Sequence, residues 1–215
     1  VFVVGKGGFL AFEDRPPKDL EQWFDARIAA RGLGTRSDLA GHHLLTPQHV
    51  VHQLERVREA TGLETLDAFL VDQPEVHVPV SGKEKMHRRL GAVFAALEQQ
   101  VKLGALGCYG ISSFEGFRVE TDAAVFQSIT SLLGLAEKAA ALVHGAGARH
   151  AFRILQLPFN QAMTEGFTRF SQATGQGNVA STIQAAHQLR VYVMATHSMG
   201  KGVLARQASD AVRVK

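Results

Sequence analysis

Short hydrophobic runs alternate along the chain with longer amphipathic stretches. Four consecutive apolar residues, Ala68 to Val71, predict a strand that is buried on both faces, as in a parallel sheet. The strand must end before Pro74, because proline cannot donate a hydrogen bond to a neighbouring strand. The same pattern of apolar runs predicts further strands at 1–4, 105–112, 152–157 and 191–196.

Apolar residues spaced by three and four positions predict helices between these strands. The clearest lies at 81–100, where Met86, Leu90 and Phe94 share one face. Thr46 and Pro47 form a typical helix start, with a threonine cap followed by proline at the first helical position. The helices are predicted at 19–30, 46–62, 81–100, 121–143 and 179–189.

The alternation of strands and helices predicts a parallel sheet built from right-handed crossovers. Five strands can be counted, whereas a closed barrel of this type needs eight. An open, doubly wound sheet needs only about five, so periodicity alone leaves both architectures open. The glycine fingerprint of dinucleotide-binding sheets is absent after the first strand. Residues 9–45 form an unusually long connection, which we interpret as an insertion, a lid or a partner surface.

Composition narrows the possible functions. The chain has 215 residues, 46% of them hydrophobic and 20% charged, which suits one large domain or an incomplete copy of a bigger one. The net charge is +3 and the basic residues are scattered, so we expect no binding to nucleic acid. None of the 10 histidines belongs to a cluster with metal-ligand spacing.

The single cysteine, Cys108, excludes an internal disulfide and fits a reducing compartment. No apolar run reaches the roughly 18 residues that a membrane span needs. We therefore expect a soluble, intracellular protein of the cytoplasm or an organelle matrix, although nothing in the sequence chooses between these compartments.

Polar residues follow several of the predicted strands. In a barrel, chemistry takes place where the strands end at the carboxyl-terminal rim, and Asp72 lies at such a position. Lys6 follows the first strand, where it can pair with a carboxylate. Ser112 and Ser113 end the strand at 105–112.

Five motifs occur in an order that resembles the aldo-keto reductase family. They cover nearly the whole chain, and their order is more specific than any one of them. The motifs are VFVVGKGG, GLETLDAFLVDQPE, GALGCYGISS, RILQLPFN and VYVMATHSMGKGVL.

The resemblance implies an α/β fold, a (β/α)8 TIM barrel of which about five of the eight strand-helix units are present. It implies a single barrel domain over residues 1–215, with the insertion at 9–45. Two strands are expected before Val1 and one after Lys215.

The family binds NADP(H) and transfers hydride to or from a carbonyl group. By position, Lys6 matches the family's catalytic lysine. The cofactor-binding positions are matched by Ser112, Ser113 (in place of asparagine), Gln156, Ser198, Gly200 and Lys201.

Asp72 stands where the family has its catalytic histidine, and this departure changes the functional prediction. A neutral imidazole donates a hydrogen bond to the substrate carbonyl, whereas an ionised carboxylate only accepts. We therefore predict a catalytically impaired, reductase-like binding or structural subunit that works with a protein partner in a larger assembly. The alternative is an active NADPH-dependent reductase of small carbonyl substrates, whose catalytic tyrosine and aspartate lie outside this sequence.

Overall fold

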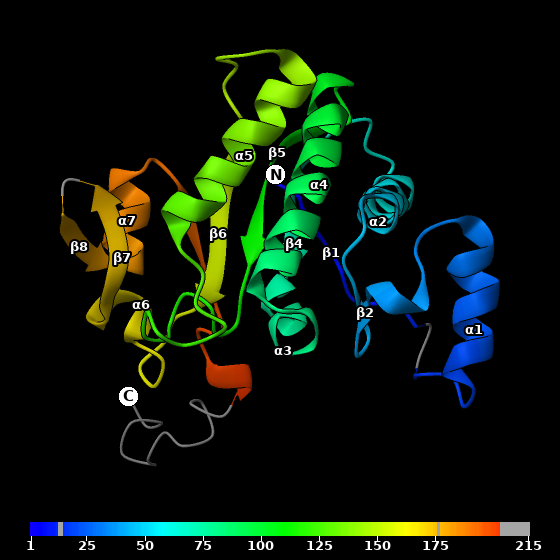
Figure 1. The fold of residues 1–215 in the computed structure, drawn as a ribbon, viewed down its shortest axis with the longest axis horizontal. Helices are drawn as coiled ribbons and strands as arrows, with labels where there is room; N and C mark the ends of the chain where they lie inside the picture. The colour runs from blue at the N-terminus through cyan, green and yellow to red at the C-terminus, as the bar shows by residue number, and fades with distance from the viewer. Residues whose placement is uncertain (13–14, 176, 203–215) are drawn as a thin grey trace.

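A computed structural model describes residues 1–12, 15–175 and 177–202. Its centre is a sheet of five parallel strands in the order β1, β4, β5, β6, β9 (Figure 1). The strands are β1 (Val4–Gly7), β4 (Leu66–Asp72), β5 (Leu106–Ser112), β6 (Phe152–Pro158) and β9 (Tyr192–Thr196). All five predicted strands are therefore present, although the first lies three residues later than expected and includes Lys6.

The strand order decides between the two architectures that the sequence left open. In a doubly wound sheet the order reverses at a switch point, and helices cover both faces. Here each new strand is added at the same edge of the sheet, so its order follows the sequence. This is the order of consecutive units in a (β/α) barrel, and within the described residues the sheet forms an open arc rather than a closed barrel.

The helices cover one face of this arc. They are α2 (Pro47–Thr61), α4 (Lys83–Lys102), α5 (Ile129–His144) and α7 (Thr182–Gln188). Their buried side chains and one face of the strands form the main core, which includes Leu54, Phe94 and Leu132. A smaller cluster on the other face is made of strand residues alone, among them Leu70 and Ile154. The strand-only face corresponds to the interior of a barrel.

Two helix predictions were wrong at their start. Helix α5 begins at Ile129 and not at residue 121, because Ser128 caps it and Gln172 binds the backbone on both sides of that cap. The side chain of Gln172 accepts a hydrogen bond from Ile129 N at 3.0 Å and donates one to Gln127 O at 2.9 Å. Residues 178–181 form a strand, and α7 begins after the cap residue Ser181.

The missed strand belongs to an antiparallel hairpin, β7 (Phe170–Gly175) and β8 (Asn178–Ser181). Short helices α3 (Val78–Ser81) and α6 (Glu165–Thr168) and single turns η3 (Pro74–His77) and η4 (Gly200–Gly202) complete the connections outside the insertion. Figure 1 shows the hairpin at one side of the molecule and α1 at the other.

The insertion at 9–45 has a small core of its own. It contains α1 (Leu20–Arg27), the turns η1 (Ala29–Arg31) and η2 (Arg36–Asp38), and the strand pair β2 (Leu39–Ala40) and β3 (His43–Leu44). Phe24, Ile28 and Leu44 are buried together there. The helix predicted at 19–30 is thus confirmed in a shorter form, capped by Asp19.

Strands β5 and β6 come unusually close at Gly110. A side-chain carbon at this position would lie 1.9 Å from the carbonyl oxygen of Ile154, so only glycine fits without moving the backbone. The register of the two strands shifts between Tyr109 and Gly110 and then brings Ser112 level with Gln156.

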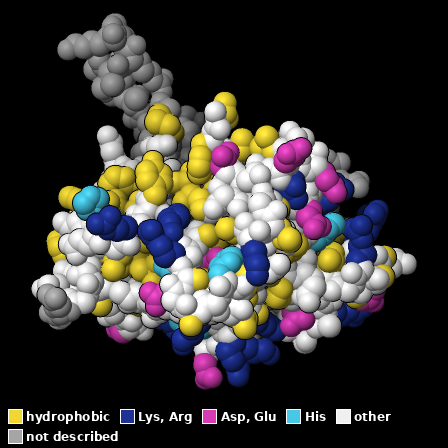
Figure 2. All heavy atoms as spheres, turned by 90° about the horizontal axis from the view of Figure 1, so that it is seen from above, with side chains coloured by type: hydrophobic (Ala, Val, Ile, Leu, Met, Phe, Trp, Pro, Cys, Tyr) yellow, Lys and Arg dark blue, Asp and Glu magenta, His cyan; other side chains and the backbone are white. Residues whose placement is uncertain are grey.

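The surface mixes residue types. Figure 2 shows basic and acidic side chains interspersed over the face that it presents, with hydrophobic side chains gathered along part of the edge. No helix in the described part of the chain combines the length and the apolarity that a membrane crossing requires.

Candidate active site

Four of the predicted site residues lie on neighbouring strands of the sheet. The pairing of β4 with β5 places Asp72 beside Ser112, and the pairing of β5 with β6 places Ser112 beside Gln156. Lys6 is on the adjacent strand β1 and reaches the same row with its long side chain. The carboxyl ends of these strands therefore bring together the residues that the sequence suggested, although their catalytic and binding roles remain predictions.

The Lys6 ammonium group holds this row together. Its Nζ atom lies 3.7 Å from Oδ1 of Asp72 and donates a hydrogen bond to Ser112 Oγ at 3.1 Å. The two charged side chains are 40% and 22% exposed, so the pair is partly screened by water. Since Ser112 accepts from Lys6, its own hydroxyl hydrogen is available for another acceptor.

Gln156 carries an unsatisfied polar atom. The side chain is only 7% exposed, and its buried Oε1 atom has no hydrogen-bond partner in the part of the chain that the structure describes. A buried acceptor without a donor costs about 1–3 kcal/mol, unless a ligand or water supplies that donor. Such an atom beside Ser112 points to a ligand with an N–H or O–H group.

Ser113 does not join this row. Its hydroxyl donates to Glu75 Oε1 at 2.5 Å and accepts from Gly116 N at 2.8 Å. Glu75 is buried, and desolvation raises the pKa of its carboxyl group even though the bond from Ser113 opposes the shift. Ser113 thus ties the loop after β5 to the turn after β4.

The predicted phosphate-binding residues lie in the loop after β9. Ser198 precedes η4, and Gly200 and Lys201 are part of it. Lys201 has a φ angle of 56°, in the left-handed region. Asn160 anchors this loop by donating from Nδ2 to the carbonyl oxygen of His197 at 2.8 Å. The last residues of that motif, Val203 and Leu204, lie outside the described part of the chain.

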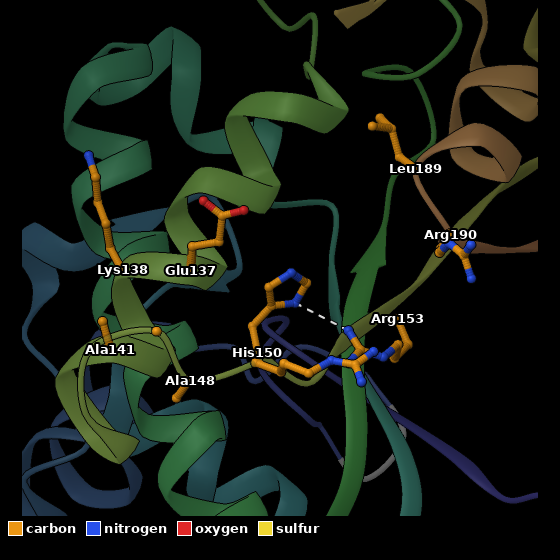
Figure 3. Close-up of a pocket in the computed structure, with 10 residues that line it drawn as sticks. Glu137, Lys138, Ala141, Ala148, His150, Arg153, Leu189 and Arg190 are labelled. Atoms are coloured by element: carbon orange, nitrogen blue, oxygen red, sulfur yellow. Dashed lines mark hydrogen bonds between the residues drawn. The ribbon is translucent and has the colours of Figure 1, made fainter.

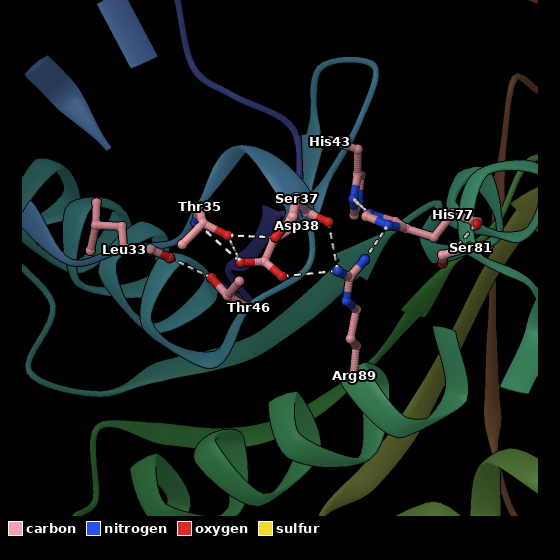
Figure 4. Close-up of polar contacts among 9 residues, drawn as sticks. All are labelled: Leu33, Thr35, Ser37, Asp38, His43, Thr46, His77, Ser81 and Arg89. Carbon is pink, nitrogen blue, oxygen red and sulfur yellow. Dashed lines mark hydrogen bonds and ion pairs between the residues drawn. The ribbon is translucent and has the colours of Figure 1, made fainter. Parts of the chain in front are cut away.

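A series of hydrogen-bonded side chains, which includes His43, His77, Arg89 and Asp38 (Figure 4), contacts the backbone of Asp72. His43 of the insertion contacts the carbonyl oxygen of Asp72 through Nε2 at 2.6 Å, and its Nδ1 lies 2.9 Å from His77 Nε2. Arg89 of α4 contacts His77 Nδ1 at 3.3 Å and pairs with Asp38 at 2.9 Å. His43 has space because Gly8 has no side chain, since a carbon there would lie 2.3 Å from Nε2.

The two ends of this series determine where the protons lie. Arg89 only donates, so His77 accepts at Nδ1 and carries its proton on Nε2. His43 must then accept at Nδ1 and donate from Nε2 to the carbonyl of Asp72. Both rings are neutral in this arrangement. Burial, which is the main cause, lowers the pKa of His43 to about 3 and that of His77 to about 4.

No sequence motif indicates this series of hydrogen-bonded side chains, because its members come from the insertion, the turn after β4 and helix α4. The adjacent residues His42 and His43 differ in burial, with His42 exposed and His43 buried. His77 contacts His43 and Arg89, and its side chain is therefore not directed into the row of Lys6 and Ser112.

A family model, described as the aldo/keto reductase family, matches residues 25–130. Over these residues, the match agrees with the resemblance to the aldo/keto reductase family that the sequence motifs indicate.

Two solved structures are similar to this chain. The PA4992 protein of Pseudomonas aeruginosa, which is assigned to the aldo-keto reductases, is 10% identical with a TM-score of 0.43, over 93% of this chain and 51% of that protein. The glycerol dehydrogenase AKR11B4 of Gluconobacter oxydans is 13% identical with a TM-score of 0.46, over 78% of this chain and 37% of that protein. The chain thus spans about half, or less, of their length. No curated protein sequence matches it.

Aldo-keto reductases typically bind NADP(H). Against that background, the row combines positions that agree with the family motif and one that does not. By the resemblance of the motifs, Lys6, Ser112 and Gln156 are expected to keep the residue types of the family, and Asp72 is expected to stand in place of a histidine. On that expectation, the row carries a carboxylate where a reductase needs a hydrogen-bond donor.

Proposed function

We propose that this chain binds a nicotinamide cofactor but transfers hydride to carbonyl groups poorly, and that it acts as a binding subunit. The observation that carries this proposal is the position of Lys6 between Asp72 and Ser112, 3.7 Å from the carboxylate and 3.1 Å from the hydroxyl. A lysine in that position is already engaged with an anion, and its positive charge is offset at the place where a reaction would need it.

Electrostatics indicates the size of the effect. Reduction of a carbonyl develops negative charge on oxygen, which hydrogen-bond donors stabilise and a nearby carboxylate opposes. Two unit charges 4 Å apart near a protein surface interact by about 4 kcal/mol. An unscreened Asp72 at such a distance would slow the reaction by roughly a thousandfold. Pairing with Lys6 reduces this penalty, but it also removes Lys6 as a polarising group.

The polar groups of Ser112 and Gln156 complement a primary carboxamide. Ser112 has a hydroxyl hydrogen to donate to a carbonyl oxygen, and Gln156 Oε1 is a buried acceptor that needs an N–H group. These are the two halves of the nicotinamide carboxamide. When bound, the cofactor would supply the hydride chemistry, while Ser112 and Gln156 would orient its ring against the sheet.

Calorimetric titration of NADPH into the protein tests the binding. We expect Ser112→Ala and Gln156→Leu each to weaken binding about tenfold, since each removes one hydrogen bond to the carboxamide. Ser113→Ala is the matched control, because its hydroxyl is directed at Glu75, and it should leave the affinity unchanged. Absence of binding at millimolar NADPH would refute the proposed function.

Turnover separates the binding subunit from an active reductase. We expect NADPH oxidation to be no faster with small aldehydes than without them, and Asp72→His to increase it. Rapid reduction by the unmodified protein would instead favour the alternative, an active carbonyl reductase with its tyrosine and aspartate outside this sequence.

The proposal of a larger assembly has separate support. Among residues 1–12, 15–175 and 177–202, strands β1 and β9 lie at the two ends of the sheet, and each pairs with a neighbour on one side only. Tyr192 of β9 is 70% exposed, and Phe2, close to β1, is 61% exposed. Unpaired strand edges with exposed aromatic residues are surfaces that folded proteins usually cover. Light scattering of the purified protein should show a species larger than one chain, and a strictly monomeric protein would contradict the assembly.

A further inference from the structure

A cavity lies at the opposite end of the sheet from the candidate active site. It has a volume of 670 Å³ and is bordered by α5, the loop at 147–150, the start of β6 and the segment that leads into β9 (Figure 3). The charged and titratable residues that line it are Glu137, Lys138, Arg149, His150, Arg153 and Arg190. Because β6 and β9 begin here, this cavity is at the amino-terminal ends of the strands.

The lining has a strong excess of positive charge. Lys138, Arg149, Arg153 and Arg190 contribute +4 and Glu137 contributes −1, so the formal charge is +3. Within residues 1–12, 15–175 and 177–202, none of these five side chains forms a salt bridge, in contrast to Arg36, Arg89 and Arg118. Cations that outnumber the nearby negative charges repel one another, and a bound anion would relieve that repulsion.

Hydrogen bonds fix the side chains of Arg153 and His150, two of the residues that line the cavity. Arg153 donates from Nη1 to the carbonyl oxygen of Phe152 at 2.8 Å and to His150 Nδ1 at 3.3 Å. His150 accepts at Nδ1, so its proton is on Nε2, which Figure 3 shows on the side of the ring away from Arg153. Burial, followed by the charge of Arg153, lowers the pKa of His150. The ring is thus a neutral donor beside a positioned guanidinium group.

Arg190 occupies a backbone position that usually belongs to glycine. It follows α7 with a φ angle of 58°, in the left-handed region that ends many helices. An arginine at such a position is uncommon, and an unusual backbone conformation of this kind is often associated with function. Here it places a cation at the border of the cavity.

We infer that this cavity binds a small phosphorylated organic anion, at a site separate from the candidate nicotinamide site. The planar guanidinium groups of Arg149, Arg153 and Arg190 suit the oxygens of a phosphate, to which arginine donates in pairs. Glu137 offers an acceptor for a hydroxyl group of the organic part, and Leu189 with the neighbouring alanines offers apolar contact.

Calorimetric titration with inorganic pyrophosphate at low ionic strength tests this site. We expect Arg190→Gly to weaken binding about tenfold, as the loss of one charged hydrogen bond does. Glycine suits the backbone at 190, so this variant should fold at least as well as the parent protein. Arg149→Ala should have a similar effect. Glu137→Gln should tighten binding about two- to fivefold, because it removes the only negative charge of the lining.

Arg88→Ala is the matched control, since Arg88 is exposed on α4 and does not line the cavity. An equal loss of affinity in this control would show diffuse attraction to a basic protein and would overturn the inference. Absence of binding at millimolar pyrophosphate would also overturn it. Loss of pyrophosphate binding in the presence of saturating NADPH would place the anion at the cofactor site instead. If pyrophosphate binds normally and NADPH does not, the proposed function fails while this site stands.

Discussion

Two polar networks meet at Asp72, and they differ in how completely their groups are satisfied. The side chain of Asp72 faces a partly exposed lysine at 3.7 Å, next to a serine with a hydrogen to donate and a glutamine with an unpaired oxygen. The backbone of Asp72 is held by His43 in a buried chain in which every ring nitrogen has a partner. The comparison teaches that the satisfied network fixes the position of Asp72, while the incomplete network is where a ligand can bind.

Breaking the buried chain should have the largest effect. In Arg89→Ala, His77 loses its donor and Asp38 loses its cation, so we expect the free energy of unfolding to fall by about 3 kcal/mol. Urea denaturation measures this change, with Arg88→Ala as the exposed neighbour that should change it by less than about 0.5 kcal/mol. A loss as small as the control's would mean that the chain does not hold the insertion to the sheet.

Lowering the pH should have the next largest effect on stability, and this effect distinguishes the two networks. An unfolded histidine takes up a proton near pH 6.5, whereas the pKa values of His43 and His77 in the fold are about 3 and about 4. The unfolded state therefore binds more protons between these limits, and stability falls as the pH drops below about 6.5. From pH 7 to pH 5 the loss is about 2 kcal/mol per histidine.

Urea denaturation at the two pH values tests this expectation. His43→Asn should reduce the pH dependence, while His42→Asn, at the exposed neighbour, should not. His49 is also buried, with a pKa of about 4, and it will account for part of the slope that remains. An unchanged slope in His43→Asn would contradict the neutral, buried state of this ring.

Removing the partly exposed ion pair of Lys6 and Asp72 should have the smallest effect on stability. We expect Lys6→Met to change the free energy of unfolding by less than about 1 kcal/mol, because partly exposed ion pairs contribute little. Chemical denaturation of this variant beside Arg89→Ala gives the contrast directly. If Lys6→Met is as destabilising as Arg89→Ala, the row at the strand ends is a structural element and not a binding site.

Much of the scaffold could be predicted from the sequence. Buried apolar runs located all five strands of the sheet, and spacings of three and four residues located α4 almost to its ends. The row of Lys6, Asp72 and Ser112 also followed from the chain, because carboxyl ends of parallel strands meet at one edge. The barrel-like order of the strands was predicted by the resemblance to the aldo-keto reductase family and not by periodicity, since five alternating units suit an open sheet equally well.

The features that could not be predicted depend on contacts between residues that are far apart in the sequence. The start of α5 at Ile129 is fixed by a hydrogen bond to Gln172, which lies 43 residues later in the sequence. No local sequence pattern indicates that contact. His43 and His77 are 34 residues apart and meet only because the insertion folds back on the sheet. The turn of Ser113 toward Glu75 likewise depends on the loop after β5, and the role of this residue in cofactor binding stays a prediction.

The close approach of β5 and β6 at Gly110 has a consequence for ligand recognition. Ser112 and Gln156 lie just beyond this point. Their strands are close together because residue 110 has no side chain. Their spacing is therefore built into the backbone before any ligand arrives, and a ligand would not have to supply the free energy to organise it. Such preorganisation makes the site selective by distance, because a molecule whose donor and acceptor are spaced differently cannot satisfy both residues at once.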